Sequence, residues 1–187
     1  MPIHTIVLVI AAVVLVLFCV RMIGLVFRYS GPRVVTCPEN HQPAGVALDR
    51  SRTLRTGLVT SPDLRLASCS RWPERAGCGQ ECLAQIEAAP ADCLVRNIVG
   101  RWYEGKVCAS CGLPFHEVQW QVSKPALLLA DKTSMEWDRV PVERLQEILA
   151  AAAPLCCSCY LAARFAGEHP DLAIERAESW KRGLPPR

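Results

Sequence analysis

The sequence predicts an α+β protein in which a single N-terminal transmembrane helix precedes a small, cysteine-rich, metal-stabilised soluble part. One observation behind this prediction is an apolar segment at 5–27, in which Arg21 is the single charged residue. Another is a set of two Cys-x-x-Cys pairs, at 108–111 and 156–159, in a chain of 187 residues with 11 cysteines. Around them, short helix-like and strand-like runs alternate, which indicates hairpins and short helices around modest cores.

The apolar segment at 5–27 is long enough to cross a membrane. At about 1.5 Å per residue, a helix of this length exceeds a hydrocarbon core of about 30 Å. Arg21 lies late enough for its guanidinium to reach the lipid headgroups. A cleaved signal peptide is the alternative, but no Lys or Arg precedes the segment and no Ala-x-Ala-like site follows it. We therefore expect residues 1–28 to form an anchor that contacts lipid through 5–27.

The charges around this segment predict its orientation. Arg28 and Arg33 follow the segment, whereas the residues before it carry no Lys or Arg. The positive-inside rule therefore places the soluble part in the cytoplasm. A reducing cytoplasm keeps cysteines as thiols that remain available to a metal.

Composition and motifs exclude several classes of function. The net charge of +3 is small and dispersed, and the densest basic stretch, at 50–55, suits a solvated loop or contact with anionic lipid. The chain has no P-loop, no dinucleotide-binding glycine motif, no His-Glu-x-x-His and no Cys-x-x-Cys-His. We therefore expect no nucleic-acid partner, no small-molecule substrate and no catalytic residues.

The two Cys-x-x-Cys pairs together predict one metal site. Four thiolates suit Zn²⁺ or a single iron, and a two-residue gap lets one tight turn present two sulfurs. Gly112 permits the positive φ with which such a turn closes. Two pairs favour a shared metal over a redox dithiol and over unrelated buried or disulfide-bonded cysteines. The predicted ligands, to zinc or alternatively to iron, are Cys108, Cys111, Cys156 and Cys159.

Cysteines in the first half of the soluble part form a second candidate set. They are Cys37, Cys69, Cys78, Cys82 and Cys93. We leave out Cys93 because it lies in an apolar-faced helix, where it can simply pack, whereas Cys37 lies beside a turn, as a metal ligand often does. His41 is an alternative ligand, free buried thiols are an alternative to any metal, and the spacings match no usual ferredoxin pattern. The predicted ligands of this second site are Cys37, Cys69, Cys78 and Cys82.

Residues 29–105 are predicted to form a cysteine-rich hairpin and helical region. The expected elements are strands at 33–37 and 44–48, and helices at 80–88 and 94–102. Asp92 is placed to cap the second helix. The segment 51–66 fits a helix and a loop equally well.

The region 106–170 contains the first predicted metal site, and a tail at 171–187 follows it. The expected elements are strands at 117–122, 126–130 and 135–137, and helices at 141–153 and 160–165. Pro154 is placed to stop the first of these helices, and Gly167 to close the second.

This order, a cysteine knuckle, a hairpin, a helix and a cysteine pair at a helix N-terminus, resembles the treble-clef group of zinc fingers. The Cys-x-x-Cys-Gly turn is also similar to a rubredoxin or zinc-ribbon knuckle. The resemblance covers about 107–167 and implies a fold and a metal but no activity. The chain departs from the pattern by the inserted helix at 141–153 and by Cys157, a competing thiol. As a whole, the chain resembles bacterial membrane-anchored cysteine-rich proteins, which implies the bacterial inner membrane as its location.

The features together favour a membrane-anchored, non-catalytic zinc protein that serves as an accessory or assembly subunit of a larger membrane complex. This function accounts for the single anchor, the cysteines and the missing catalytic motifs. The first alternative is a rubredoxin-like electron carrier with iron on four cysteines. The second is a thiol oxidoreductase, which would use one Cys-x-x-Cys pair and leave the other without a role.

Overall fold

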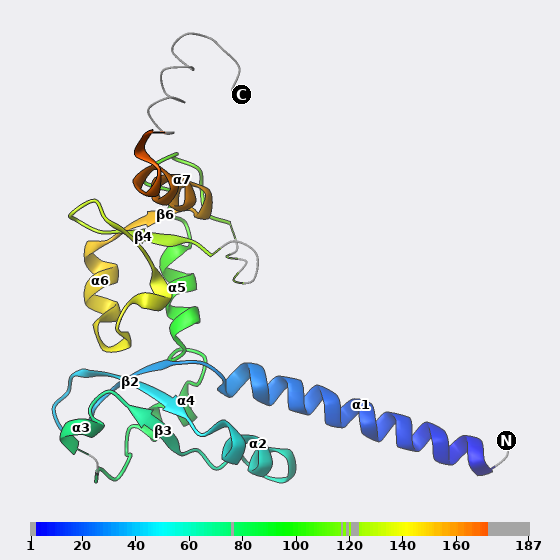
Figure 1. The fold of residues 1–187 in the computed structure, drawn as a ribbon. Coiled ribbons are helices and arrows are strands. Elements are labelled where there is room, and N and C mark those ends of the chain that lie inside the picture. Colours follow the sequence, from blue (N-terminus) through cyan, green and yellow to red (C-terminus); the bar gives the residue numbers. More distant parts are fainter. Residues whose placement is uncertain (1–2, 76, 117, 119, 121–123, 172–187) are drawn as a thin grey trace. The chain divides into compact units, whose positions relative to one another are not determined.

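The computed structural model describes residues 3–75, 77–116, 118, 120 and 124–171. The chain divides into two compact units, Met1–Ile98 (unit 1) and Val99–Arg187 (unit 2). Each unit contains a three-stranded antiparallel sheet with helices (Figure 1), so the predicted mixture of helices and small sheets is confirmed. The predicted domain limits at 28, 105 and 170 stay predictions. The predicted strand at 117–122, apart from residues 118 and 120, lies outside the described residues, as does nearly all of the tail.

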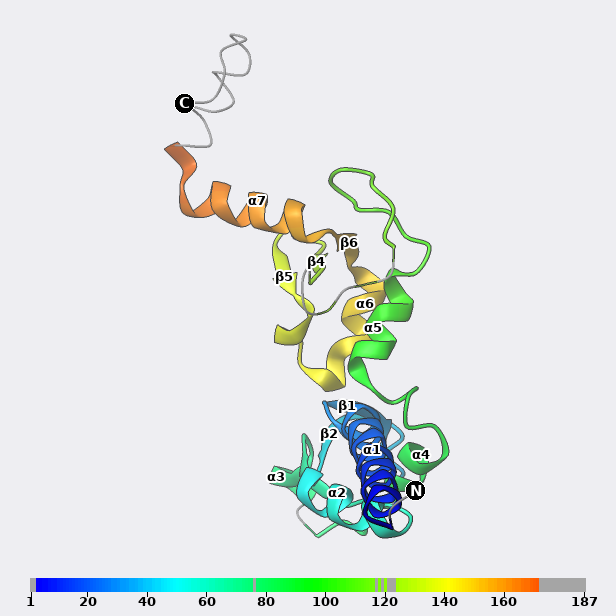
Figure 2. The same ribbon diagram turned by 90° about the vertical axis from the view of Figure 1, so that its right-hand side faces the viewer.

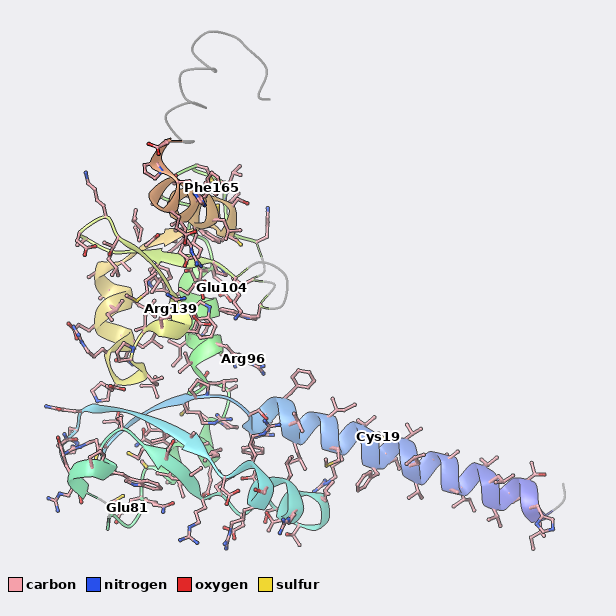
Figure 3. The ribbon with its side chains drawn as sticks, viewed as in Figure 1. Cys19, Glu81, Arg96, Glu104, Arg139 and Phe165 are labelled. Atoms are coloured by element: carbon pink, nitrogen blue, oxygen red, sulfur yellow. The ribbon has the colours of Figure 1, made fainter. Side chains whose placement is uncertain are left out.

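Helix α1, Ile3–Tyr29, is long and apolar enough to cross a membrane. Its most apolar window has a mean hydropathy of 3.1, and none of that window is buried by the rest of the protein. Side chains such as Leu8 and Leu17 are exposed although a soluble unit would bury them. Figure 3 shows Cys19 on this helix, where its thiol is exposed.

The C-terminal part of α1 packs against helix α2, Arg50–Val59 (Figure 2). The Arg21 guanidinium donates from Nε to the Gly57 carbonyl oxygen at 2.9 Å and from Nη2 to that of Thr60 at 3.1 Å. The last carbonyl groups of a helix carry the negative end of its dipole, which suits a cation. Arg21 therefore has partners in the protein itself, beyond the headgroups expected from sequence.

Arginines also hold the end of α1. Arg33, whose side chain is fully buried, donates to the carbonyl oxygens of Arg28 and Pro90. Arg96 donates from Nη2 to the Phe27 carbonyl oxygen at 3.0 Å. Burial lowers the pKa of Arg33, whereas the nearby Cys93 and Tyr29 act in the opposite direction. These bonds satisfy carbonyl groups at the end of α1 that have no partner within the helix.

The sheet of unit 1 has the order β1-β2-β3. Its strands are β1 Arg33–Thr36, β2 Pro43–Leu48 and β3 Leu66–Cys69. The hairpin of β1 and β2 confirms the prediction from sequence, and its register pairs Val35 with Ala44. The segment that fitted helix and loop equally well holds α2, capped by the Asp49 side chain, which accepts from the Arg52 N–H at 3.1 Å. The strand β3 was not predicted.

Three helices complete unit 1 and lead out of it. They are α3 Trp72–Arg75, α4 Leu83–Ala88 and α5 Val95–Tyr103. Helix α4 begins at Leu83, three residues after the predicted start. Gln80 cannot belong to the helix, because its φ of 61° lies in the left-handed region. Ile86 of α4 is fully buried against the sheet core, which includes Val35 and Leu66.

The sheet of unit 2 has the order β5-β4-β6. Its strands are β4 Ala126–Leu128, β5 Ser134–Glu136 and β6 Ala153–Leu155. The hairpin of β4 and β5 was predicted, whereas β6 falls where a helix end and a stop at Pro154 were expected. Pro154 is accommodated because β6 is an edge strand, where a missing N–H costs little.

The helices of unit 2 also differ from the prediction at their ends. In place of one helix at 141–153, the chain forms a 3₁₀ turn η2, Val142–Arg144, followed by α6, Leu145–Ala151. A second 3₁₀ turn, η1, Trp137–Arg139, comes before them. Helix α7, Cys157–Glu168, begins three residues before the predicted start and passes through Gly167.

Candidate metal centre

The first cysteine pair lies on a tight turn. The Cys108 N–H donates to the Leu113 carbonyl oxygen at 2.8 Å, and the Gly112 N–H donates back to the Cys108 carbonyl oxygen at 2.9 Å. Gly112 takes the predicted positive φ, 72°, where a side chain would be strained. The turn therefore presents the Sγ atoms of Cys108 and Cys111 on one side.

The second cysteine pair lies at the start of α7. Cys156 is the N-cap residue, and its Sγ accepts from the Cys159 N–H at 3.5 Å. A side chain that caps a helix in this way is held at the helix N-terminus together with the first turn. Cys156 and Cys159 are therefore positioned by the same helix start.

Two hydrogen bonds donated by backbone N–H groups join the segments that carry these cysteine pairs. The Ala109 N–H donates to the Pro154 carbonyl oxygen of β6 at 2.8 Å. The Cys156 N–H donates to the Cys108 Sγ at 3.3 Å. The unpredicted strand β6 thus ties the first turn to the residues just before α7, which places all four thiols together.

The distances between the four sulfurs fit a tetrahedral metal. The Sγ atoms of Cys108, Cys111, Cys156 and Cys159 all lie within 4.8 Å of one another, and Cys111 and Cys156 are 3.8 Å apart. A tetrahedral site with Zn–S bonds of about 2.3 Å has sulfur–sulfur edges of about 3.8 Å. A disulfide would need about 2.05 Å, and all four cysteines are free. The structure therefore brings together all four predicted ligands of the first site in a form that suits a metal.

The surroundings of the sulfurs shift the pKa values of two thiols, Cys108 and Cys156, in opposite directions. Burial alone would raise the pKa of Cys108, but hydrogen bonds from the backbone of Cys111, Cys156 and Ser110 lower it to about 6. Burial raises the pKa of Cys156 to about 12, with added contributions from its sulfur neighbours. Cys108 therefore ionises at a lower pH than Cys156, and a bound cation would stabilise a thiolate at Cys156.

The cluster is enclosed on one side only. Cys108 is buried against Ala126, Leu155 and Tyr160, whereas Cys111 is exposed. Four thiolates fill every place of a tetrahedral ion, so a substrate would find no open position on it. The arrangement therefore suits a structural ion or a one-electron centre rather than metal-assisted hydrolysis.

Cys157 and the second candidate set take other positions. Cys157, predicted as a competing thiol, is half-buried and outside the cluster. The second candidate set, Cys37, Cys69, Cys78 and Cys82, lines one cavity in unit 1. Among the described residues, only the first cluster has ligand atoms grouped within 4.8 Å.

The two alternative ligands lie elsewhere. Cys93 donates from Sγ to the Gln85 carbonyl oxygen at 3.7 Å, and exposed His41 does not line the cavity.

Comparisons of the chain with family models, with curated proteins and with solved structures find no match. The treble-clef and zinc-ribbon resemblance therefore depends on the spacing of the cysteines and the order of the elements. No local pattern in the sequence predicts β6 or the bond from the Cys156 N–H to the Cys108 Sγ, because each joins residues that are distant along the chain.

Proposed function

We propose that this chain is a membrane-anchored, non-catalytic protein that holds a structural Zn²⁺ in unit 2 and serves as an accessory or assembly subunit of a membrane complex. The observation that carries the proposal is the group of four sulfurs within 4.8 Å of one another. A turn and a helix N-terminus position these sulfurs in a preformed arrangement, as a structural metal requires.

A structural role for the metal follows from what the cluster connects. Its ligands come from the turn at 108–112 and from the start of α7, and the cluster packs against β4 and β6 through Ala126 and Leu155. The strands of this sheet are only three residues long, so their own pairing contributes little stability. Metal binding would supply folding free energy that such a small core lacks.

A role as a subunit is supported by the surface of unit 2. Leu113 beside the metal cluster is 65% exposed, and Leu161 of α7 is also exposed. Phe165 of the same helix, labelled in Figure 3, is exposed as well. Large apolar side chains exposed in a small unit are typical of surfaces that bind other proteins. The apolar helix α1 supports attachment to the bacterial inner membrane, and Arg28 and Arg33 after it favour a cytoplasmic soluble part.

Metal analysis of the full-length chain purified in detergent tests the metal site. We expect zinc in the wild type, its loss from the cluster in Cys108→Ser, and its retention in Cys157→Ser, the matched control one residue from a ligand. Zinc on four thiolates is colourless, whereas oxidised iron on four thiolates is red, so a red protein would support the electron carrier instead. Equal metal contents in both variants would exclude the proposed ligand set.

The membrane and subunit roles need separate tests. Membrane-impermeant thiol labelling of Glu104→Cys, at an exposed position that is not a proposed ligand, should occur from the cytoplasmic side only. Labelling from the periplasmic side would reverse the orientation. Crosslinking in membranes through a photoreactive residue that replaces Phe165, in a chain that keeps all four ligands of the cluster, should capture defined membrane proteins. A chain that remains monomeric in this assay would contradict the subunit role.

A further inference from the structure

We propose that unit 1 binds a second thiophilic cation of the zinc class, in the cavity lined by Cys37, Cys69, Cys78 and Cys82. This site would be separate from the four-cysteine cluster of unit 2 and goes beyond the proposed function, which requires only that cluster. The cation would link β1, β3 and the segment before α4.

The fold places the four cysteines where segments of unit 1 converge. Cys37 directly follows β1, in a turn closed by its N–H, which donates to the Gln42 carbonyl oxygen at 2.9 Å. Cys69 is the last residue of β3 and pairs with Val46 of β2. Cys82 immediately precedes α4, and Cys78 lies in the loop before it. Ligands on three segments are typical of a metal that fastens a small domain.

The cavity is large enough for an ion and has an apolar wall. It offers about 30 Å³ to the centres of water-sized molecules, roughly twice the minimum for one water. Val35, Ala44 and Leu66 contribute the apolar wall. Thiolates are the ligands that a soft or borderline cation selects in such a setting, because neither carboxylates nor water compete well there.

The four cysteines line the same cavity, and three of them act electrostatically on the fourth, Cys82. Burial raises the pKa of Cys82 to about 11, and the charges of Cys69, Cys78 and Cys37 add to this increase. The group is looser than the cluster of unit 2, which alone among the described residues meets within 4.8 Å. Binding would therefore draw these side chains inward by rotation about their Cα–Cβ bonds.

Two donors beside the cavity suit thiolate ligands. Arg71 Nη1 lies 3.9 Å from the Cys37 Sγ. The indole Nε1–H of Trp72, which also lines the cavity, is buried and has no acceptor among the described residues. A divalent ion on four thiolates carries an excess negative charge, which a guanidinium offsets and an N–H group stabilises. Figure 3 marks Glu81, a cavity-lining residue between Cys78 and Cys82.

Counting metal ions in the full-length chain in detergent tests this inference. After reconstitution with Zn²⁺ or with Co²⁺ as a spectroscopic probe, we expect two ions in the wild type and one in Cys69→Ser. Cys78→Ser should give the same loss, and its half-buried loop position makes misfolding a smaller concern. Cys93→Ser is the matched control in the same unit and should retain two ions.

A variant of the other cluster separates this inference from the proposed function. Cys111→Ser should also retain one ion, and the double variant Cys69→Ser/Cys111→Ser should retain none. One ion in the wild type that is lost in Cys111→Ser and unaffected by Cys69→Ser would overturn the second site and leave the proposed function intact. One ion that is lost in Cys69→Ser and kept in Cys111→Ser would support the second site and overturn the first.

Discussion

The backbone N–H of Cys156 donates to the sulfur of Cys108 at 3.3 Å, across 48 positions of the chain. This bond does more than link two cysteine pairs. Together with the backbone hydrogen bonds from Cys111 and Ser110, it lowers the pKa of Cys108, which favours a thiolate there before any metal binds. A cation is thus attracted to a partly charged site whose geometry is already set.

The effect of removing that sulfur should be large. Cys108→Ser should destabilise the protein by about 3–5 kcal/mol, since structural zinc binding contributes directly to folding free energy. Cys157→Ser should change stability by about 1 kcal/mol or less, because its thiol is outside the cluster. Thermal unfolding of the zinc-loaded proteins measures both, and similar melting temperatures for the two variants would contradict the assignment.

Acid should act on the metal-free cluster through Cys108. Its pKa of about 6 in the folded chain lies below the value of about 8.5 for an unfolded cysteine. The stability that this thiolate contributes is therefore fully present above about pH 8.5 and is lost as the pH falls through about 6. Ultraviolet thiolate absorbance of chelator-treated protein should show one group titrating near pH 6.

Cys108→Ser is the control for that titration and should remove the group that titrates near pH 6. The same absorbance change in the variant would assign the acidic thiol to another cysteine.

Truncation should separate membrane attachment from metal binding. A chain lacking residues 1–28 should leave the membrane fraction and still bind metal, because every proposed ligand lies beyond Arg28. A chain lacking only residues 1–20 should also be released. Its soluble part should be more stable than that of the chain lacking residues 1–28, because it keeps the contacts of Arg21 and Leu25 with α2. Fractionation and thermal unfolding measure both effects, and a truncated chain that stays in membranes without a partner would refute the single anchor.

Packing of α1 on α2 should depend on the small size of Gly57. A Cβ atom at this position would lie 3.0 Å from a Leu25 methyl carbon, so Gly57→Leu should overpack the contact and destabilise the chain by about 1–3 kcal/mol. Leu25→Ala in the same chain should recover much of that loss by making room.

Gly24→Leu is the control for this contact, since a Cβ there would have nothing within 4 Å. It should leave the stability of the soluble part unchanged. Thermal unfolding in detergent is the measurement. A Gly57→Leu variant as stable as Gly24→Leu would show that the two helices do not pack in this way.

Local signals predicted the parts of this fold that local residues determine. The hairpin around the turn at 37–42 and the hairpin of β4 and β5 each have short turns between apolar runs, and both form as expected. The spacing of Cys108 and Cys111 likewise reflects one turn closed by Gly112. In such cases, the residues that make the structure are neighbours in the chain.

The missed features depend on distant residues. Strands β3 and β6 are short, and each exists because a strand far along the chain offers an open edge. The early start of α7 has a local cause instead, because the Cys156 sulfur acts as the N-cap although cysteine is not a usual capping residue. The partners of Arg21 are more than 30 residues away, so composition alone placed this side chain among lipid headgroups.

In the proposed membrane setting, the bonds of Arg21 to α2 set a limit on bilayer thickness. If these bonds hold Arg21 at the edge of the hydrocarbon core, lipid tails can surround only the stretch 3–20. That stretch rises roughly 27 Å at about 1.5 Å per residue, a few Å less than a typical hydrocarbon core. A thicker bilayer must thin around the protein, at a cost of fractions of a kcal/mol per Å, or draw Arg21 away from its carbonyl partners. Hydrophobic mismatch would therefore act directly on the hydrogen bonds between Arg21 and α2, and lipids with shorter tails would favour these bonds.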